Sequence, residues 1–597
     1  MTNTAIALAA AHREGSLSPR ETAECTLQRI EAADDPAMFI SIRDKAELLA
    51  EAEALGARRG EALPLLGVPV AVKDNIDVAG LPTTAACPAF TYRPEKDAAA
   101  VARLKAAGAL IIGKTNLDQF ATGLVGARSP YGMPRNALRP DLLPGGSSSG
   151  SAVAVARGIV PLALGTDTAG SGRVPAGLNN IVGLKPSLGL ISTSGVVPAC
   201  RSLDCVSIFA LTAADALVAL TVMAGPDARD PFSRCMAVGE LTALPPVLRI
   251  GVPRVADRHF FGDSVSEAAF AAAERIATRL GATLVEIDLT PFFDTAALLY
   301  HGPWVAERTA AVGDFIASNP DAIHPITKAI ISQGFSKTAI DTFNGLYRLR
   351  ELSGMALPAF DRIDALMVPT VPTPVTHAAL EADPIGLNTQ LGTYTNFVNL
   401  LDLAGIAVPA ALSEDRMPFG VTFLAPAGRD AMLASLGAAF HRETGLTLGA
   451  LDAPQPPIAF APSSLQAGEI EVAVVGAHLS GMPLNHELTG LGGRFLAETE
   501  TAADYQLYAL VGTVPPKPGM LRVGAGSGAR IKLECWALPA EGFGWFVAGV
   551  PSPLSIGMVA LGDGRQVKGF LVEAEATAGA RDISNFGGWR AFLASKG

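Results

Sequence analysis

The stretch Pro144-Gly145-Gly146-Ser147-Ser148-Ser149-Gly150-Ser151 is followed by a second glycine-rich stretch, Gly165-Thr166-Asp167-Thr168-Ala169-Gly170-Ser171-Gly172-Arg173. Upstream, the apolar run Gly67-Val68-Pro69-Val70-Ala71-Val72 ends in Lys73. The apolar run predicts a buried strand with a lysine at its end, and a helix and a further strand are expected between the two serine-bearing turns. Alternation of this kind is typical of α/β proteins.

These stretches hold the groups needed for nucleophilic attack on an amide without histidine. A serine hydroxyl attacks a carbonyl only when a base takes its proton, and histidine is the usual base. The chain has 8 histidines, and none lies near either serine in sequence. Burial after an apolar run would lower the pKa of Lys73, because desolvation disfavours the ammonium form. We therefore expect Lys73 to act on Ser147, which relays the proton of Ser171.

The second turn also offers donors for an oxyanion. Its side chains are small enough for backbone N–H groups to converge on one oxygen, and one such donor contributes about two to three orders of magnitude in rate. The predicted oxyanion hole comprises Thr168, Ala169, Gly170 and Ser171.

These motifs resemble the amidase signature family over roughly residues 1–445, together with Gly113-Lys-Thr-Asn-Leu-Asp-Gln-Phe-Ala-Thr-Gly123 and Gly183-Leu-Lys-Pro-Ser187. The resemblance implies that Ser171 is the acyl-enzyme nucleophile and Lys73 the base. It makes Ser147 the bridging serine and implies a cis peptide bond before it. Asp167 and Arg173 are expected to support the nucleophile turn, and contact between Arg173 and substrate stays open.

Two glycines of the common family pattern are replaced, by Ser149 and Ala169. Ala169 requires a backbone angle compatible with a Cβ, because only glycine adopts positive φ at little cost. With Asp118-Gln119 and Gly126-Ala-Arg-Ser-Pro-Tyr-Gly132, these replacements resemble the allophanate hydrolase branch. The resemblance implies hydrolysis of allophanate, urea-1-carboxylate.

Such a substrate requires a cation, and arginine holds a carboxylate best in a bidentate pair. Tyr300 and Arg308 are spaced so that they would share a face if their stretch is one helix. The resemblance implies that both bind the substrate carboxylate and that Gly123 lines the same pocket. An exposed surface arginine is the alternative.

The predicted fold is α/β: an amidase signature fold with a central mixed β-sheet, largely parallel, covered by helices. The predicted domains are residues 1–450, a proline-rich linker over 451–468, and a small, mostly stranded α+β domain over 469–597. Predicted strands in the last part include 470–475, 505–510, 532–537 and 568–572.

This second domain resembles the C-terminal domain of allophanate hydrolases, related in fold to gamma-glutamyl cyclotransferases, through Val475-Gly-Ala-His-Leu-Ser-Gly-Met-Pro-Leu-Asn485, Leu491-Gly-Gly-Arg-Phe495 and Tyr505-Gln-Leu-Tyr508. The resemblance implies decarboxylation of the product N-carboxycarbamate in this domain, and spontaneous decarboxylation is the alternative. His478 is the candidate for binding or proton transfer, and a capping histidine in an assembly domain is the alternative. His486 is expected to be structural.

Composition limits the partners. The formal net charge of −11 does not suggest a nucleic-acid binder. The sequence has no run of 18 apolar residues, so no membrane span is predicted. The opening residues also lack the pattern of an export signal, and a cytoplasmic location is therefore expected. The 6 cysteines do not form a disulfide or zinc pattern, and no metal or other cofactor is expected.

The expected net reaction converts allophanate to ammonia and carbon dioxide, in urea or cyanuric-acid degradation, by a homodimer with urea carboxylase or another pathway enzyme as a partner. Two alternatives remain open. One is a chain resembling the glutamyl-tRNA amidotransferase subunit that shares the Lys-Ser-Ser core. The other is a broader amidase whose C-terminal domain is a non-catalytic assembly module.

Overall fold

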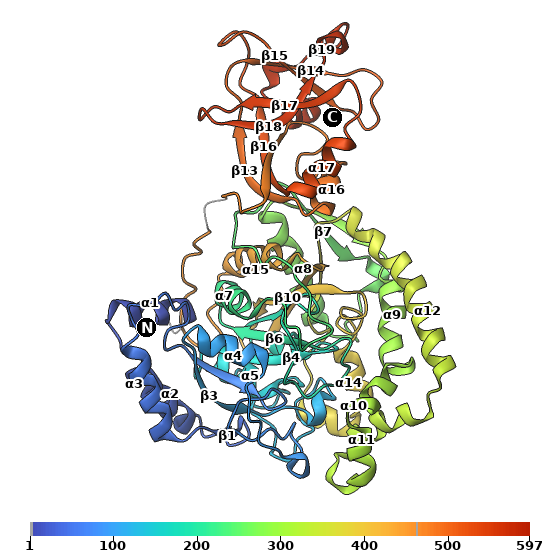
Figure 1. Ribbon diagram of the computed structural model, residues 1–597. Coiled ribbons are helices and arrows are strands. Elements are labelled where there is room, and N and C mark those ends of the chain that lie inside the picture. Colours follow the sequence, from blue (N-terminus) through green and yellow to red (C-terminus); the bar gives the residue numbers. More distant parts are fainter. Residues whose placement is uncertain (1–3, 461–463, 597) are drawn as a thin grey trace. The chain divides into compact units, whose positions relative to one another are not determined.

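The computed structural model describes residues 4–460 and 464–596, coloured along the chain in Figure 1. It divides into two compact units. The first comprises Met1–Gly239, Ile250–Leu280 and Leu284–Ile458, and the second comprises Glu240–Arg249, Gly281–Thr283 and Ala459–Gly597. The proposed linker over 451–468 includes residues 461–463, which lie outside the described residues.

The first unit is built on one mixed sheet of 11 strands. In spatial order these are β1 (Phe39–Ile42), β3 (Leu110–Thr115), β2 (Pro69–Lys73), β4 (Leu162–Asp167), β6 (Cys205–Ala210), β5 (Val182–Lys185), β10 (Leu403–Leu412), β11 (Pro418–Pro426), β9 (Ala365–Pro369), β7 (Leu248–Pro253) and β8 (Ala282–Ile287).

The expectation of a largely parallel sheet is wrong. Strand β2 runs parallel to both β3 and β4, but the pairs from β4 through β6, β5, β10 and β11 to β9 are all antiparallel. Alternating strands and helices in sequence suggested parallel crossovers. The order β4-β6-β5-β10 instead places neighbouring strands beside one another in opposite directions.

Helices pack on this sheet, among them α5 on β4 and β2, α7 on β6 and β5, and α15 on β10 and β11. The helices of the first unit are α1 (Ala5–Glu14), α2 (Pro19–Ala33), α3 (Lys45–Gly56), α4 (Ala99–Ala106), α5 (Ser149–Ala156), α6 (Val174–Leu178), α7 (Ala213–Met223), α8 (Ser264–Arg279), α9 (Thr290–His301), α10 (Trp304–Ser318), α11 (Pro325–Ser332), α12 (Ala339–Ala356), α13 (His377–Ala382), α14 (Gly386–Leu391) and α15 (Asp430–Thr444).

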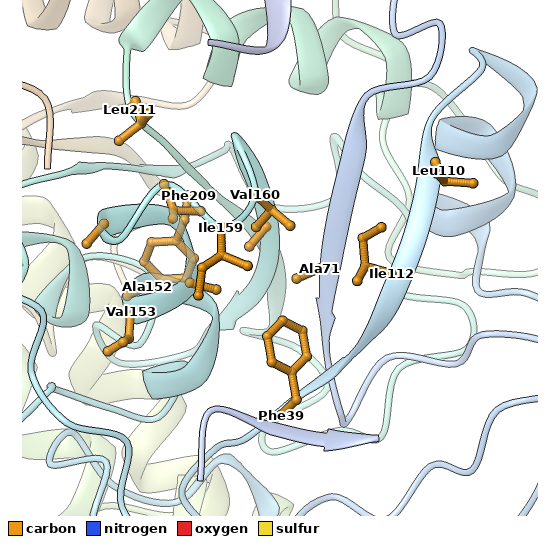
Figure 2. Close-up of a cluster of buried hydrophobic side chains, with 14 of the residues drawn as sticks. Phe39, Ala71, Leu110, Ile112, Ala152, Val153, Ile159, Val160, Phe209 and Leu211 are labelled. Carbon is orange, nitrogen blue, oxygen red and sulfur yellow. The ribbon is translucent and has the colours of Figure 1, made fainter. Parts of the chain in front are cut away.

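One buried cluster joins strands β2, β3, β4 and β6 to α5 (Figure 2). Ala71, Ile112 and Phe209 belong to it, as do Ala152 and Val153 of the helix. All five side chains are fully buried, so the cluster fixes the strand that ends in Lys73 against the helix that follows Ser147.

The second unit contains two smaller sheets. One has the order β13 (Arg494–Glu500), β16 (Lys532–Pro539), β12 (Glu469–Val474), β18 (Gln566–Val572), β17 (Leu554–Ala560), and the other β15 (Pro518–Arg522), β14 (Tyr505–Ala509), β19 (Arg581–Asp582). Its helices are α16 (Asn485–Gly490), α17 (Ala540–Ala548) and α18 (Trp589–Ala594). The predicted strands at 470–475, 505–510, 532–537 and 568–572 correspond to β12, β14, β16 and β18.

No helix within residues 4–460 and 464–596 is long and apolar enough to cross a membrane.

Candidate active site

Lys73 lies at the end of β2 and is fully buried. Its Nζ donates to Ser147 Oγ at 2.7 Å and to Thr166 Oγ1 at 2.8 Å. The peptide bond between Gly146 and Ser147 is cis. The structure therefore brings together the two residues predicted to begin the proton relay.

Burial lowers the pKa of Lys73 to about 7, against the opposing attraction of Asp118, Asp167 and Asp204. The ordinary pKa of lysine is about 10.4. A lysine with a pKa near 7 is neutral in a large fraction of molecules at neutral pH, as a general base must be.

The turn that presents Ser147 is held by Asp118. Ser147 accepts the Asp118 N–H at 3.0 Å through its carbonyl. The Asp118 carboxylate accepts N–H groups of Val125, Gly126 and Arg128 at 3.2, 2.9 and 2.8 Å. A Cβ on Gly146 would lie 2.0 Å from Asp118 Oδ2, so only glycine fits before Ser147.

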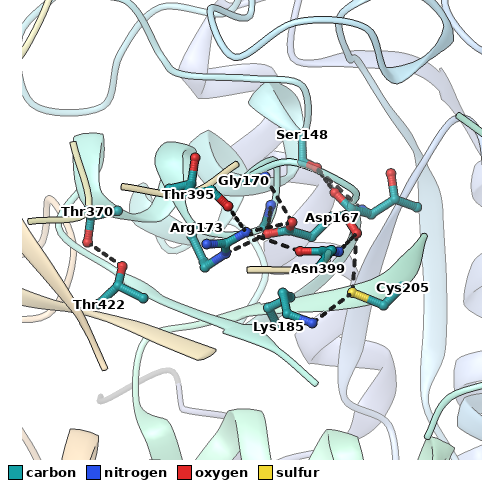
Figure 3. Close-up of polar contacts among 12 residues, drawn as sticks. Ser148, Asp167, Gly170, Arg173, Lys185, Cys205, Thr370, Thr395, Asn399 and Thr422 are labelled. Atoms are coloured by element: carbon teal, nitrogen blue, oxygen red, sulfur yellow. Dashed lines mark hydrogen bonds and ion pairs between the residues drawn. The ribbon is translucent and has the colours of Figure 1, made fainter. Parts of the chain in front are cut away.

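Ser171 lies in the turn after β4. An ion pair between Asp167 and Arg173 supports this turn (Figure 3). Arg173 Nε and Nη2 donate to Asp167 at 2.9 and 3.0 Å. Burial raises the pKa of Asp167, but Arg173 and Lys185 outweigh that effect and hold it below its ordinary value. Asp167 and Arg173 thus lie where the sequence predicted them, as supports of the turn.

The second link of the predicted relay is not formed in this structure. Ser171 is 4% exposed, and its hydroxyl has no hydrogen-bond partner among the residues described. Catalytic hydrogen bonds in free enzymes are often long and tighten on binding substrate. The geometry thus joins Lys73 to Ser147 and leaves the Ser171 hydroxyl unpaired in the second turn.

Of the four backbone N–H groups predicted to form an oxyanion hole, one already has an acceptor. The Gly170 N–H donates to Asp167 Oδ1 at 2.9 Å, so it is already occupied. In the described part of the chain, the N–H groups of Thr168, Ala169 and Ser171 have no acceptor and stay free for an oxyanion. Ala169 lies outside the positive-φ region, which explains why alanine can replace glycine there.

Tyr300 and Arg308 meet, but not on one helix. Tyr300 belongs to α9, and Arg308 belongs to α10. Gly302 and Pro303 separate the two helices, so the condition for a shared face, one continuous helix, is not met. The Arg308 guanidinium nevertheless lies 5.5 Å from the centre of the Tyr300 ring.

Arg308 is 1% exposed, so the alternative of a surface arginine is excluded. Its Nη1 donates to Thr122 Oγ1 at 3.3 Å, next to Gly123, and its buried Nε has no partner. It makes no ion pair with any carboxylate in the described residues. A buried guanidinium left in this state costs free energy unless an acceptor arrives.

Three further residues lie in this region that the sequence motifs did not indicate. Thr166 is the second acceptor for Lys73. Asp204 accepts the hydroxyl of Thr168. Arg128 is buried and donates to the carbonyl oxygen of Thr122 at 3.1 Å. Thr166 and Arg128 lie within the sequence motifs quoted above, and this position was the only signal of a role in the site. Asp204 lies outside those motifs, so no sequence signal indicated it.

In the second unit, His478 Nε2 lies 2.8 Å from Glu487 Oε2. Its ring stacks on Phe570 at 5.0 Å and meets Phe546 edge-on at 5.1 Å. Burial lowers the pKa of His478, and Glu487 only partly offsets this. His486 contacts the carbonyl of Pro483 at 2.9 Å. His478 thus packs against two phenylalanine rings and has one carboxylate as a hydrogen-bond partner.

Within residues 4–460 and 464–596, no group of three or more His, Cys, Asp and Glu side chains is arranged to hold a metal ion.

Comparison with known proteins covers both units. Residues 21–434 match the family described as amidase, and residues 470–594 match the allophanate hydrolase C-terminal domain. The solved structure of SeMet-substituted Kluyveromyces lactis allophanate hydrolase is 40% identical, with a TM-score of 0.76, and the match covers 98% of each chain.

Among curated proteins, urea amidolyase of Saccharomyces cerevisiae is 43% identical over 570 residues, which cover 93% of this chain. The chain spans only 31% of the length of that relative. A glutamyl-tRNA(Gln) amidotransferase subunit from Chromohalobacter salexigens is 35% identical over 74% of this chain and 96% of its own length.

Proposed function

This chain belongs to the amidase family and carries a C-terminal domain of the allophanate hydrolase type, and we propose from this premise that it hydrolyses allophanate. The products of the complete reaction are ammonia and carbon dioxide. The fold of both units matches that of an allophanate hydrolase.

One observation carries the substrate assignment: the buried Arg308 guanidinium has an unpartnered Nε and, among the described residues, no ion pair. The Tyr300 ring and Thr122 flank it. A carboxylate would supply the missing negative charge and accept the free donors, and charge-assisted bonds of this kind are about twice as strong as neutral ones. Allophanate carries such a carboxylate at one end and an amide at the other.

The first half of the reaction uses the groups around Lys73. Neutral Lys73 takes a proton from Ser147, which takes one from Ser171 as Ser171 Oγ attacks the terminal carbonyl. The free N–H groups of Thr168, Ala169 and Ser171 stabilise the developing oxyanion. The carbon–nitrogen bond breaks, and ammonia leaves with the proton returned through Ser147. Water then cleaves the acyl-enzyme by the same relay.

The product of that half is N-carboxycarbamate, which has two carboxylates. It loses carbon dioxide either spontaneously or in the second unit, where His478 is the proposed group for binding or proton transfer. We further propose that the chain forms a homodimer in the cytoplasm, and that urea carboxylase or another enzyme of urea or cyanuric-acid degradation supplies its substrate. The longer urea amidolyase relatives support the link to urea.

An amidotransferase subunit is the weaker alternative. Its support is the 35% identity to the relative from Chromohalobacter salexigens. That relative matches 74% of this chain, and it leaves both the second unit and the unpaired Arg308 without a role.

The test is ammonia release from freshly prepared allophanate and from the neutral amide propionamide. Ser171→Ala should lose at least about a thousandfold on both, because no nucleophile remains. Arg308→Ala should lose about a hundredfold or more on allophanate, as expected for a buried charged contact, and little on propionamide. Ser16→Ala, an exposed serine far from this site in sequence, is the matched control.

Equal losses on the two substrates in Arg308→Ala would contradict the carboxylate assignment. Wild-type activity on propionamide alone would keep the amidase and reject allophanate as its substrate.

A further inference from the structure

A short loop, residues 199–204, is bonded to the turn that carries Ser171. The buried Asp204 carboxylate accepts the hydroxyl of Thr168 and the N–H groups of Ala199 and Cys200, the latter two at 2.8 and 3.1 Å. Burial raises the pKa of Asp204 to about 6, against these hydrogen bonds and the attraction of Arg308. One end of the loop is therefore tied to the oxyanion turn.

The loop is also bonded to helix α10. Glu307 Oε1 accepts the Ser202 N–H at 2.6 Å, and Glu307 Oε2 accepts the Ser202 hydroxyl at 2.8 Å. Cys200 Sγ also lies 3.5 Å from the carbonyl oxygen of Trp304, the first residue of α10. Two charge-assisted bonds to one residue fix both distance and orientation. Glu307 immediately precedes Arg308.

Apolar packing joins the same parts. Ala169 of the oxyanion turn lies in one buried cluster with Cys200, Leu299 and Trp304, and Tyr300 packs against that cluster. The Ala169 methyl group, absent from the usual glycine, thus contacts the apolar surroundings of the carboxylate site. Closely packed interiors transmit displacements, because side chains have few voids to move into.

From these contacts we propose that Glu307 is a positioning residue that sets the span between the Arg308 guanidinium and the oxyanion turn, and so selects short carboxylated amides. The inference rests on the proposed function. A small substrate held at both ends tolerates little error: a displacement of about 1 Å costs on the order of a hundredfold in rate. The two hydrogen bonds between Glu307 and Ser202, here called the clamp, fix the distance between Arg308 and the oxyanion turn without contacting the substrate.

A purely structural role for Glu307 makes a different prediction. It would lower stability and reduce turnover of every amide by the same factor. A positioning role changes the two substrates unequally, because propionamide has no carboxylate to be held at Arg308.

The test compares Glu307→Ala, Glu307→Asp and the matched control Asp314→Asn, an exposed acid on the same helix, in the full chain. For allophanate, Glu307→Ala should lower kcat/KM by about a hundredfold, with both a higher KM and a lower kcat. Glu307→Asp keeps the charge but shortens the reach, and should show an intermediate loss. For propionamide, kcat/KM should change by less than about threefold, and Asp314→Asn should match the wild type on both substrates.

Ser202→Ala removes one of the two clamp bonds without touching α10, and covers the case in which Glu307→Ala does not fold. It should lose several-fold on allophanate alone. Equal losses on both substrates, or no loss on allophanate, would overturn the proposal. If the wild type releases no ammonia from allophanate, the proposed function fails. The same variants are then compared on malonamate, another carboxylated amide, and a loss of kcat/KM on malonamate but not on propionamide would still support the positioning role of Glu307.

Discussion

At the scale of single residues, the site depends on one lysine kept out of water. Lys73 has three carboxylates in its surroundings, yet burial still brings its pKa to about 7. Its two hydrogen-bond partners are both hydroxyls, of Ser147 and Thr166. Neither bears a charge that would hold the ammonium form. Desolvation therefore supplies the neutral base that the proposed serine relay needs in place of histidine.

This predicts the pH dependence of turnover. The base works only when neutral, so the active fraction rises as pH increases through about 7 and is nearly complete above about 8. Below pH 7 kcat/KM should fall about tenfold per pH unit. Steady-state ammonia release between about pH 5 and 9 measures this. Lys73→Arg, which cannot lose its proton, should be inactive throughout, and a flat wild-type profile from about pH 5 to 8 would refute the role of Lys73.

The residues that were predictable share one property: their chemistry is visible in local sequence. Lys73, Ser147 and Ser171 stand in distinctive small-residue motifs. Asp204 and Glu307 do not, because the hydrogen bonds that distinguish them, to Thr168 and Ser202, form only in the folded chain. The occupied N–H of Gly170 was likewise invisible, since composition does not reveal which donor an adjacent carboxylate takes.

At the scale of elements, the sequence predicted those next to the site: the apolar run before Lys73 is β2, and the helix and strand expected between the two serine-bearing turns are α5 and β4. Helix ends follow local rules as well: α2 begins with a capping box between Ser18 and Glu21, two residue types that favour a helix start at this spacing. The break between α9 and α10 was missed because the apolar pattern continues across it. Gly302 and Pro303 were the available signals, since proline removes a backbone donor and favours a helix start.

Helix α12 leads to a prediction about assembly. Ile340, Phe343 and Tyr347 are 73%, 55% and 63% exposed, and their spacing places them on one face. Exposed apolar faces of this kind mark interaction sites, and the proposed homodimer supplies a second copy as the partner. In sedimentation equilibrium, Tyr347→Glu should weaken the dimer at least about thirtyfold, the cost of losing an aromatic anchor.

The matched control for that experiment is Val511→Glu, another exposed apolar residue that lies in the second unit. It should leave the dimer unchanged. A wild-type chain that sediments as a monomer, or a Tyr347→Glu dimer of undiminished affinity, would remove α12 from consideration.

At the scale of the whole molecule, sequence indicated the mixed sheet and a second small domain but not the directions of the strands. The direction of a strand depends on which strands it pairs with. Strand β5 pairs with β6, the next strand in the chain, and also with β10, which lies far along the chain. The grouping of Glu240–Arg249 with the second unit was equally hidden, because nothing in a short proline-containing segment says which core it will join.

The presence of two compact units suggests two separable chemical steps. A substitution of His478 tests this suggestion in the intact chain. If the second unit decarboxylates N-carboxycarbamate, His478→Ala should leave the first equivalent of ammonia unchanged and slow the release of carbon dioxide, together with the second equivalent of ammonia that follows it. Ser171→Ala should stop the release of both products. The reason is the position of His478: its ring packs against Phe546 and Phe570, and its Nε2 contacts the carboxylate of Glu487. A histidine paired with one carboxylate is suited to proton transfer. His486→Ala is the control. Stopped-flow measurement of both products decides the matter, because unaltered carbon dioxide release in His478→Ala would assign the second step to spontaneous chemistry or to other residues.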